Sequence, residues 1–591
     1  MESDGPQPTT GRWNYARILT PYHLPTRRRK PFACLAVMTD GRAGPFLSAH
    51  YVTEDAPEMV QTLDDVDALC DVVLSWRGSE YLWYAHQGGE QDYQYLYAAL
   101  LARMGREPEM RVDVMSQGRD RVMGFVVRRG HRRWELRDSF ALLPVPLEAL
   151  VADFAPQARG DWEPVRCLLA VLRGAYRLME QTFGVVPGWT VGSTGLAAWR
   201  ATLRPGEYYS RTRPAVEAFC REGYYGGLSF LTSTARQTDM ATLDVNSMYP
   251  AVMREHGVPA GVAAYTSQER DHEPGYYRVR AQVPRCTIRP PLAVRDAGAV
   301  SWPTGTFTTV ATSAEIIYAR TQGVTVEVEW GYTFGRLIHP FRRFVDACET
   351  IRTSQPGTAR DRLAKMLQAN LYGKFGARPL IERYALFGTP PDLDEWHPMV
   401  DRQTGEVLPY LYTRVEALNA GYLHPEWAGW ITAQARLVLL RAVEAVGAGR
   451  VVYGDTDSLT APVSALEAAI ARGALSLGTG YGQWKVERVY RWFRAGAPKN
   501  YQGELCDGRT RDTVAAIPLG VVRHDEHARA LDGEAIQTHA PLAPHTLHVL
   551  QGAPIAAGVL RRSYGGLDET KWERDTAQDV RPREQTDSKE A

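Results

Sequence analysis

Apolar residues follow two rhythms along this chain, an alternation typical of strands and a three-to-four-residue spacing typical of helices. From Pro31 to about Trp162, short apolar runs alternate with turn residues and with helical stretches. The elements expected here are helices at Asp64–Leu74 and Asp92–Met104 and neighbouring strands at Val122–Arg128 and Arg133–Phe140. This mixture predicts an α/β domain in the first part of the chain.

The pattern becomes more varied after residue 162. Arg166–Phe183 carries apolar residues at helical spacing and predicts a helix. Further expectations are a short strand at Met240–Val245, strands mixed with Pro and Gly over 255–340, mostly helix over Phe341–Phe375 with a break near Gln355–Gly357, an irregular Pro-rich stretch over 378–415, a long helix at Trp427–Val446 and a strand–turn–strand at Val451–Ala461. These changes along the sequence predict several domains.

The bulk composition sets limits without pointing to a partner. A chain of 591 residues has room for roughly three to five domains of about 150 residues each. Lys plus Arg equals Asp plus Glu at 68 each, so a polyanionic partner would have to meet local basic surface, such as Arg27–Lys30 or the arginines around His131. The seven scattered cysteines contain no CxxC pair and predict neither a disulfide framework nor a structural zinc site.

The sequence also bears on location. No apolar run is long enough to cross a membrane, and the N-terminal residues Met1–Asp4 are polar and acidic, unlike a signal peptide. We therefore expect a cytoplasmic protein with no membrane partner.

The first chemical candidate is a pair of carboxylates one residue apart, Asp455 and Asp457, which follow the β-branched residues Val451 and Val452. In an extended chain, residues i and i+2 project to the same face, so the two carboxylates can point together. Two like charges this close favour a cation between them, and hard oxygen ligands suit Mg²⁺. A solvent-exposed hairpin turn would have the same residues, so the pair alone does not establish a metal site.

Two other segments carry related chemistry. Asp244 ends a β-prone run and is followed by polar residues and Tyr249; alone, it would be interpreted as a turn or helix cap. On a helix, Lys365, Arg362 and Tyr372 would share a face, where a cation and a ring could hold a triphosphate and a sugar or base. An ordinary surface helix with one half-buried tyrosine is the alternative.

Taken in order, these segments resemble the A, B and C motifs of the family B DNA polymerases. They read Asp-Val-Asn-Ser-Met-Tyr-Pro at 244–250, Lys-Met-Leu-Gln-Ala-Asn-Leu-Tyr-Gly at 365–373 and Tyr-Gly-Asp-Thr-Asp-Ser at 453–458. Glu222–Gly227 is similar to the Tyr-x-Gly-Gly element of the family, and Ala497–Tyr501 to its Lys-x-Tyr element. In its size and in these matches, the chain resembles the protein-primed bacteriophage and plasmid branch of the family. The resemblance runs from about residue 30 to residue 505. The resemblance is specific in the motifs and loose in the insertions.

The resemblance implies a multidomain α/β and α+β fold, in which a ribonuclease-H-like exonuclease domain precedes a right-hand polymerase with palm, fingers and thumb. The expected parts are a flexible segment at 1–29, the exonuclease-like domain at 30–200, the palm at 201–254 and 416–518, the fingers at 341–376, the thumb at 519–580 and a disordered tail at 581–591. Insertions resembling terminal-protein regions 1 and 2 are expected at 255–340 and 377–415.

The resemblance also implies a DNA-directed DNA polymerase that works by two-metal phosphoryl transfer. Asp244 and Asp457 would bridge two Mg²⁺ ions, which Mn²⁺ could replace; Asp455 would support them and the Val245 carbonyl would add a ligand. The partners implied are a DNA template and primer, dNTPs and a terminal protein, in a bacterial cell or a phage-infected host cell.

Nucleotide and primer contacts carry over in the same way. Lys365 would compensate triphosphate charge, Tyr249 would lie under the sugar and exclude a 2′-hydroxyl, and Tyr372 would pack on the nascent pair. Further nucleotide-binding positions are Arg362 and Asn370, and primer- or DNA-binding positions are Lys499, Tyr501, Tyr224, Gly226 and Gly227. One departure is Ala369-Asn370, where the family usually has Asn-Ser, and it is expected to alter nucleotide affinity or fidelity.

The N-terminal region resembles the 3′–5′ exonuclease domain of the family but lacks most of its carboxylates. Its second motif falls on Tyr84–Asp92 and keeps Asp92. Ala36 and Met38 stand where the first motif is acidic, and the third motif falls on Cys167 and Val171. One carboxylate cannot hold two metal ions, so we expect an inactive scaffold that still guides single-stranded DNA. Misaligned motifs, with Asp40, Glu54 or Asp161 serving instead, are the alternative.

Three other functions compete with protein-primed synthesis. A nucleic-acid-primed repair or bypass polymerase would share every catalytic residue and differ only in its partner. A non-catalytic DNA-binding pseudo-polymerase would have no need of clustered carboxylates. Another palm enzyme, such as a reverse transcriptase or a nucleotide cyclase, fits the Tyr-Gly-Asp-Thr-Asp-Ser spelling and the Lys-containing B helix less well.

Overall fold

The chain folds into two units, each drawn from three separate stretches of sequence. The computed structural model describes residues 18–25, 29–40, 44–117, 121–160, 162–296, 298–401, 404–418 and 420–513, together with 527, 531 and 553–554. The larger unit comprises Met1–Thr26, Ala175–Pro379 and Asn419–Leu542, and the smaller unit comprises Arg27–Gly174, Leu380–Leu418 and Ala543–Ala591. Almost all of the predicted thumb (519–580), the whole tail (581–591) and most of the predicted flexible segment (1–29) lie outside the described residues.

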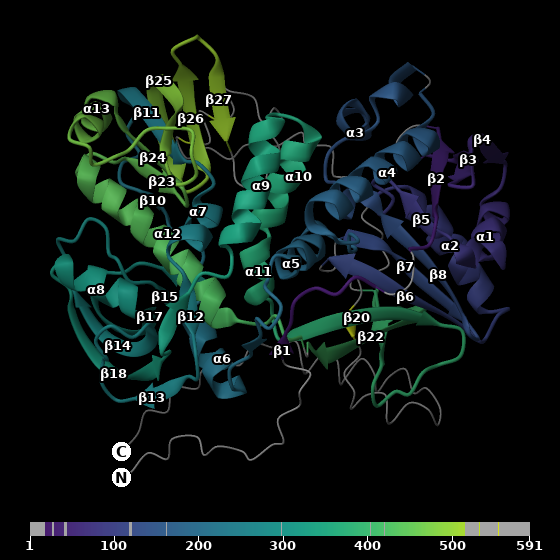
Figure 1. The fold of residues 1–591 in the computed structure, drawn as a ribbon, viewed down its shortest axis with the longest axis horizontal. Helices are drawn as coiled ribbons and strands as arrows, with labels where there is room; N and C mark the ends of the chain where they lie inside the picture. The colour runs from purple at the N-terminus through teal and green to yellow at the C-terminus, as the bar shows by residue number, and fades with distance from the viewer. Residues whose placement is uncertain are drawn as a thin grey trace. The chain divides into compact units, whose positions relative to one another are not determined.

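The smaller unit is built on one sheet. In the described residues, its strand order is β28-β21-β22-β20-β6-β7-β8-β5-β2-β3-β4, with β2–β5 and β5–β8 parallel and the other pairs antiparallel (Figure 1). The strands are β2 (Phe32–Thr39), β3 (Phe46–Thr53), β4 (Ala56–Leu63), β5 (Leu82–Ala85), β6 (Met110–Gln117), β7 (Arg121–Arg129), β8 (Arg132–Asp138), β20 (Leu380–Phe387), β21 (His397–Val400), β22 (Val407–Ala417) and β28 (Ala553–Pro554). The predicted strand pair at 122–140 is confirmed as β7 and β8.

Helices α1 (Val66–Leu74) and α2 (Asp92–Met104) cover one face of this sheet. The unit also contains α3 (Leu147–Phe154) and the first part of α4 (Pro164–Phe183), with 3₁₀ turns at Arg77–Glu80, Ser139–Ala141 and Pro156–Gly160. Alternate residues of β2, including Ala33 and Leu35, share a core with Leu69 of α1 and Leu96 of α2. Because alternate strand residues project to one face, this core identifies the face that α1 and α2 cover. The helices predicted at 64–74, 92–104 and 166–183 are confirmed.

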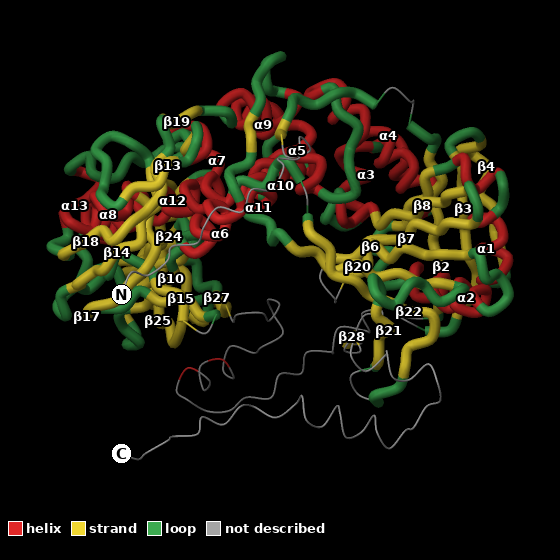
Figure 2. The backbone as a smooth tube through the Cα atoms, turned by 90° about the horizontal axis from the view of Figure 1, so that it is seen from below, coloured by secondary structure: helices red, strands yellow, loops and turns green. Residues whose placement is uncertain are grey.

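The prediction of an irregular stretch over 378–415 is wrong. This stretch forms β20, β21 and β22, and β20 extends the sheet by pairing with β6, with Tyr384 opposite Val114 (Figure 2). The prolines that suggested irregularity lie in the connections, in β21 (Pro398) and near the start of β22 (Pro409), and Leu386 and Leu411 are fully buried in the core of the unit. Burial against an existing sheet, which local sequence does not report, overrides the high proline content.

The larger unit carries a seven-stranded antiparallel sheet in its described residues, in the order β10-β23-β24-β11-β25-β26-β27. The strands are β10 (Ser229–Leu231), β11 (Gln237–Val245), β23 (Tyr453–Asp455), β24 (Ser458–Pro462), β25 (Trp484–Ala497), β26 (Asn500–Leu505) and β27 (Thr510–Thr513). The helices α7 (Met248–Glu255), α12 (Pro425–Val446) and α13 (Val463–Ala471) accompany it. The strand at 240–245, the helix at 427–446 and the strand–turn–strand at 451–461 are confirmed.

A second, four-stranded sheet occupies residues 264–333 of the same unit. Its order is β13-β18-β14-β17, with β13 (Ala264–Thr266), β14 (Gly275–Val283), β17 (Gly305–Thr312), β18 (Thr325–Thr333) and the helix α8 (Ser313–Thr321). Strand pairs are β12 (Val258–Ala260) with β19 (Arg336–Ile338), β15 (Val294–Asp296) with β16 (Ala299–Ser301), and β1 (Ile18–Leu19) with β9 (Tyr209–Ser210). The last pair gives part of the segment predicted to be flexible a fixed partner.

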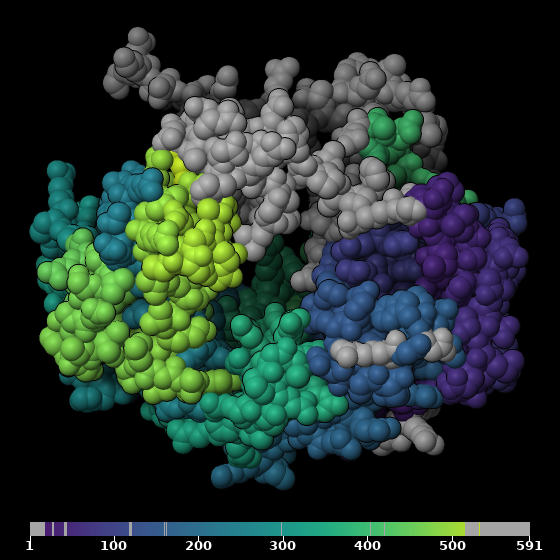
Figure 3. Space-filling model, turned by 90° about the horizontal axis from the view of Figure 1, so that it is seen from above, coloured from purple at the N-terminus to yellow at the C-terminus, as the bar shows by residue number. Residues whose placement is uncertain are grey.

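The remaining helices of the larger unit are α5 (Val191–Ala201), α6 (Pro214–Glu222), α9 (Arg342–Ser354), α10 (Ala359–Ala369) and α11 (Leu371–Phe375). The predicted helical region at 341–375 is confirmed, including its break between α9 and α10. Trp199, Phe341, Phe375 and Trp427 form an aromatic core with ring centroids 5.1–6.2 Å apart. In the space-filling view, α9 and α10 and the strands β25–β27 present surface on the same face of this unit (Figure 3).

Two further expectations can be compared with the structure. All seven cysteines are free thiols, as the absence of a paired pattern predicted. Among the described residues, no helix combines the length and the apolar character needed to span a bilayer.

Candidate active site

The sheet of the larger unit joins two distant segments of the chain where β11 pairs with β24. Asp244, near the end of β11, lies opposite Ser458 at the start of β24, and Asp455, at the end of β23, also lies opposite Ser458. The backbone N–H of Val245 donates to the Asp457 carbonyl at 2.8 Å. Strand pairing therefore gathers the three predicted carboxylates at one end of the sheet.

The geometry of the β23–β24 hairpin differs from the predicted one. Asp455 ends β23, and Thr456 and Asp457 form a tight turn in which Thr456 has φ of 60°. The N–H of Asp457 donates to the Asp455 carbonyl at 2.6 Å. The two carboxylates are neighbours because of this turn and not because of strand alternation. A non-glycine residue at positive φ is uncommon, and such strain concentrates at functional sites.

Two lysines neutralise part of this charge. Lys485 Nζ lies 2.9 Å from Asp244 Oδ1, and Lys499 Nζ lies 3.1 Å from Asp455 Oδ2. Asp455 Oδ1 also accepts from Ser229 Oγ at 2.6 Å. Burial, followed by the negative charge of Asp244, raises the pKa of Asp457 to about 6. Of the three carboxylates, Asp457 is the one whose negative charge is least compensated.

The chemistry of these side chains fits a divalent cation, although the arrangement seen is not a closed ligand cluster. Within the described ranges, no group of three or more His, Cys, Asp or Glu side chains is placed to hold a metal ion. Carboxylate oxygens are nevertheless the ligands that Mg²⁺ prefers, and a cation beside Asp457 would offset the repulsion from Asp244 and Asp455. The donor set is therefore suitable for a hard divalent ion.

The segment Tyr224–Gly227 lies directly against the carboxylate turn. The Thr456 N–H donates to the Leu228 carbonyl at 2.8 Å, and a Cβ at Gly227 would lie 2.6 Å from Thr456 Oγ1. Only a residue without a side chain allows this approach. The predicted Gly227 thus supports the hairpin that carries Asp455 and Asp457.

A buried arginine that the sequence patterns did not reveal holds this segment in place. Arg436, in the middle of α12, is 1% exposed. Its Nη1 donates to the carbonyls of Tyr225 (2.8 Å) and Gly226 (2.7 Å), and its Nη2 lies 2.6 Å from Glu315 Oε1. The arginine therefore connects α12 and α8 to the backbone beside the hairpin.

The two tyrosines predicted to contact a nucleotide meet each other. The rings of Tyr249 (α7) and Tyr372 (α11) stack with centroids 4.5 Å apart and an interplanar angle of 25°. Burial raises the pKa of Tyr249, and it raises that of the nearby Tyr224 to about 12. A Cβ at Gly376 would collide with the ring of Tyr224, so this ring also packs closely.

Lys365 and Tyr372, expected to share a face of one helix, lie on two successive helices. Helix α10 ends at Ala369 and α11 begins at Leu371; Asn370 between them keeps a right-handed helical backbone, its N–H donates to the Met366 carbonyl at 3.0 Å, and its side-chain amide donates to the same carbonyl at 2.9 Å. Lys365 and the predicted Arg362 are exposed on α10, whereas Tyr372 is half-buried on α11. The cation and the ring therefore sit on separate helices.

A polar network that sequence reasoning missed connects α9 and α10 to the turn after Asp244. Arg352 Nη1 donates to Ser247 Oγ at 2.6 Å and to Tyr481 Oη at 3.0 Å, and its Nε lies 2.8 Å from Asp361 Oδ1. The buried amide of Gln368 also donates to Tyr481 Oη at 2.6 Å. The only local signal is Asp361, which follows the helix N-cap of α10.

The two predicted primer contacts have different surroundings. Lys499 lies in the β25–β26 turn, and its N–H donates to Tyr453 Oη at 2.9 Å. Tyr501 packs against Tyr453 and Phe493, with centroids 5.5 Å apart in both cases, at the edge of a hydrophobic cluster. Lys499 thus presents its ammonium group to Asp455, while Tyr501 contributes mainly to packing.

In the smaller unit, two buried carboxylates lie close together. Asp92 Oδ1 accepts from the Val37 N–H at 2.6 Å, and burial raises the pKa of Asp92 to about 7. Asp138 Oδ1 accepts from the Phe140 N–H at 2.9 Å, and burial raises its pKa to about 6. The charge of Asp138 acts on Asp92, so Asp138 is a second acidic group that the motif comparison did not count.

The positions expected to have lost their carboxylates are ordinary parts of the unit. Ala36 and Met38 lie on β2, and Val171 is completely buried in α4. Of the alternative carboxylates, Glu54 is engaged by Arg29 at 2.8 Å and Arg173 at 3.2 Å. Although burial acts to raise its pKa, these hydrogen bonds lower the pKa of Glu54 to about 2.

The other two alternatives have less to support them. Asp40 is exposed after the end of β2, and Asp161 lies outside the described residues. Glu54 is already paired, so Asp92 and Asp138 are the two neighbouring carboxylates of this unit that remain as candidates.

The known proteins that this chain resembles, described below, are DNA polymerases. Residues 165–389 match the family model of DNA polymerase type B, organellar and viral. The DNA-directed DNA polymerase of Enterobacteria phage PRD1 is 25% identical over 398 residues, covering 64% of this chain and 66% of the relative. The DNA polymerase of Bacillus phage B103 is 23% identical over 366 residues, covering 54% and 59%. A probable DNA polymerase of Neurospora intermedia is 23% identical and covers 54% and 34%.

The chain thus spans less than two thirds of the length of each of these relatives. Among solved structures, it resembles phi29 DNA polymerase in complex with primer–template DNA and incoming nucleotide, with a TM-score of 0.67 and 16% identity. The likeness covers 84% of this chain and 95% of the other. At this identity the likeness defines the fold, an exonuclease-like unit combined with a right-hand polymerase architecture.

Proposed function

We propose that the chain is a DNA-directed DNA polymerase of family B, which adds dNMP to a 3′-hydroxyl on a template. The observation that carries the proposal is the gathering of Asp244, Asp455 and Asp457 at the end of one sheet by the pairing of β11, β23 and β24. A scaffold protein has no need of such a costly concentration of charge.

Asp244 and Asp457 are the residues that would hold two Mg²⁺ ions, or Mn²⁺ in their place, with Asp455 and the Val245 carbonyl completing the site. Such ions, when bound, lower the pKa of the primer 3′-hydroxyl and neutralise the leaving pyrophosphate. The protein's own contribution is positioning: the hairpin fixes Asp455 and Asp457, and Arg436 and Gly227 fix the hairpin. Lys499 and Lys485 keep cationic groups beside the carboxylates, where the primer backbone would pass.

The incoming nucleotide would lie between the carboxylates and the exposed surface of α10. Lys365, which is exposed and unpaired in the described part of the chain, supplies a cation for the triphosphate, with Arg362 one turn earlier. The stacked rings of Tyr249 and Tyr372 form a flat apolar wall that suits the sugar and the base. Asn370 keeps these two sets of residues apart by ending α10.

Discrimination against ribonucleotides tests the role of Tyr249. We expect Tyr249→Ala to improve the kcat/KM for ribonucleotides relative to deoxyribonucleotides by about tenfold or more, because an open space replaces a ring. Single-turnover incorporation of dCTP and CTP measures this ratio. Tyr318→Ala, a tyrosine of α8 away from this stack, is the control. An unchanged ratio in Tyr249→Ala would place the sugar gate elsewhere.

The same assay separates synthesis from proofreading. On a singly primed DNA template with Mg²⁺ we expect extension, and without nucleotides we expect no 3′-end degradation of single-stranded DNA. The reason is that the neighbouring carboxylates Asp92 and Asp138 are buried and lack the first- and third-motif partners needed for a second ion. Degradation that disappears in Asp92→Asn would contradict the prediction that the exonuclease-like unit is inactive.

We further propose that priming uses a hydroxyl on a separate terminal protein. Support comes from the likeness to phage DNA polymerases and from the presence of additional strands at 255–340 and 377–415, where the resembling branch carries its insertions. Incubation with dNTPs and candidate small basic proteins encoded nearby would transfer labelled dNMP onto a protein. Extension of DNA primers alone, with no labelled protein under any condition, would favour a repair or bypass polymerase.

A further inference from the structure

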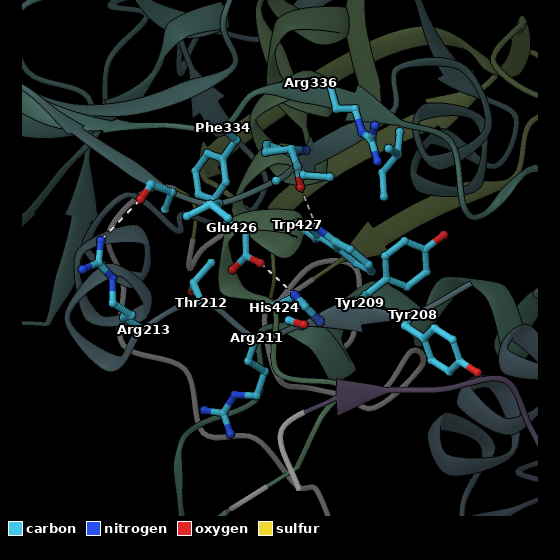
Figure 4. Close-up of a pocket in the computed structure, with 17 residues that line it drawn as sticks. Tyr208, Tyr209, Arg211, Thr212, Arg213, Phe334, Arg336, His424, Glu426 and Trp427 are labelled. Carbon is cyan, nitrogen blue, oxygen red and sulfur yellow. Dashed lines mark hydrogen bonds and ion pairs between the residues drawn. The ribbon is translucent and has the colours of Figure 1, made fainter. Parts of the chain in front are cut away.

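A pocket of about 710 Å³ lies in the larger unit, and none of the motif residues lines it (Figure 4). It is lined by residues of four segments, at 208–213, 259–263, 334–338 and 424–427. Its volume is within the range of about 300–1,000 Å³ that small-molecule sites occupy. The polymerase chemistry proposed above uses none of these residues.

The inner wall of the pocket contains polar atoms without partners. His424 Nδ1 lies 2.8 Å from Glu426 Oε1, and these two side chains are 1% and 2% exposed. Within the described residues, His424 Nε2, Glu426 Oε2 and Thr212 Oγ1 are buried and make no hydrogen bond. Because a buried polar atom without a partner is unfavourable, this wall is suited to a ligand that donates hydrogen bonds.

A row of aromatic rings leads from this wall toward the surface (Figure 4). The ring of His424 stacks on that of Trp427 with centroids 4.2 Å apart and an angle of 14°. Tyr209 meets Trp427 edge-on at 5.2 Å, and Tyr208 next to it is 62% exposed. An exposed tyrosine at a pocket mouth provides a stacking surface for a planar ring.

Two arginines at the pocket lack acidic partners. Arg213 and Arg336 are exposed, and neither forms an ion pair with a described carboxylate; Arg213 only approaches the Ala263 carbonyl at 3.4 Å. Arg211, by contrast, is held by both oxygens of Glu217 at 2.6 Å. The two exposed guanidinium groups are therefore available for an anion, and the planar fork of a guanidinium group matches the oxygens of a phosphate.

We propose that this pocket is a second nucleotide-binding site, separate from the carboxylate centre. The base would stack on Tyr208 and Tyr209, and its phosphate would contact Arg336, which lies on the same side of the pocket as the two tyrosines (Figure 4). Its exocyclic amino group would point toward the wall that holds Glu426 and His424. Adenine, guanine and cytosine carry such an amino group and thymine does not. The nucleotide is either free in solution or one unit of a single strand, and the chemistry of recognition is the same for both.

The test measures binding without catalysis. The full-length chain in EDTA is titrated with dAMP, with dTMP and with a single-stranded hexamer of deoxyadenosine, and binding is followed by equilibrium dialysis. We expect dAMP or the hexamer to bind, with about tenfold weaker binding after Arg336→Ala and a similar loss after Tyr208→Ala. The corresponding thymidine ligand is expected to bind about tenfold more weakly, because thymine presents a carbonyl oxygen where adenine and cytosine carry the amino group, and this acceptor cannot donate to Glu426.

Two control variants and a cross-linking experiment show whether the ligand binds in this pocket. Tyr265→Ala removes a tyrosine of comparable exposure (59%) outside the pocket, and Arg472→Ala removes the exposed arginine that follows α13; both variants are expected to bind normally. Cross-linking with 8-azido-dAMP, or with a hexamer carrying 8-azidoadenine, followed by mass spectrometry should modify the peptide containing Tyr208 and Tyr209.

Pocket-dependent binding of dAMP identifies free nucleotide as the ligand, and pocket-dependent binding of the hexamer alone identifies a strand. Binding of neither ligand, or binding that the Tyr208 and Arg336 variants leave unchanged, overturns the proposal. Because the readout needs no divalent ion and no incorporation, its failure is distinct from a failure of the proposed polymerase activity.

Discussion

Replacing Asp457 with asparagine is expected to lower the rate of nucleotide incorporation by a factor on the order of a thousand or more, while DNA binding and folding stay nearly intact. Asp457 is the carboxylate of the hairpin turn that lies within reach of the charges of both Asp244 and Asp455. A group that acts only in the transition state is lost from kcat and not from ground-state binding. Single-turnover primer extension gives the rate, and fluorescence anisotropy of labelled primer–template gives the affinity.

The matched control is Asp239→Asn, on the same strand as Asp244. Asp239 is exposed, makes no hydrogen bond or ion pair with a described residue, and has φ of 54°, a conformation that asparagine tolerates well. This control should keep full activity. Incorporation by Asp457→Asn within tenfold of the unmodified chain would show that the metal site has been misplaced.

The second large effect is expected from Arg436→Met, which should lower the free energy of unfolding by about 3–5 kcal/mol. The substitution removes a 1% exposed guanidinium group and leaves Glu315 as a buried carboxylate without its ion-pair partner. It also frees the carbonyls of Tyr225 and Gly226, so the hairpin beside them loses support and incorporation should fall as well. Urea unfolding followed by tryptophan fluorescence measures the change in the transition of the larger unit.

Two further variants separate the causes of this loss. Adding Glu315→Gln to Arg436→Met should recover part of the stability, because the unpaired charge is removed. Arg441→Met, on the exposed side of the same helix, should change the unfolding free energy by less than about 0.5 kcal/mol. If Arg436→Met lowered the free energy of unfolding as little as Arg441→Met, Arg436 would not organise the site.

Local patterns were sufficient for most helices and for the carboxylate segments. The helix at 427–446 and the hairpin at 451–461 follow from apolar spacing over neighbouring residues, and Asp244, Asp455 and Asp457 stand out because acidic residues interrupt β-prone runs. The resemblance to family B polymerases then gave an order to segments that are individually ambiguous. That these carboxylates bind metal ions and transfer nucleotides stays a prediction.

Features that depend on distant contacts could not be predicted. Arg436 lies in a helix of mostly apolar residues and contacts Tyr225, 211 positions away, so nothing near it in sequence marks its role. Tyr481 and Arg352 are 129 positions apart. The strands at 380–417 were missed because a proline-rich composition dominates the local pattern, whereas their stability comes from pairing with β6 and burial of Leu386 and Leu411.

The turn at Asp457 and the break at Asn370 show a second limit. Sequence periodicity predicts both residues on regular elements, in which neighbours share one face. In the structure, Thr456 adopts a positive φ in a tight turn, and Asn370 separates α10 from α11, so single residues interrupt the regular elements. Periodic patterns do not report such local departures, and both occur beside the candidate site.

The central claim is that Asp244 and Asp457, far apart in sequence, hold the same divalent ions. Fe²⁺ bound in place of Mg²⁺, with ascorbate and hydrogen peroxide, cuts the backbone close to the ion, and mass spectrometry locates the cuts. The account predicts cuts in both 243–247 and 454–458, which excess Mg²⁺ suppresses and which Asp457→Asn removes. Cuts in only one of these segments, or cuts that Mg²⁺ does not suppress, would contradict it.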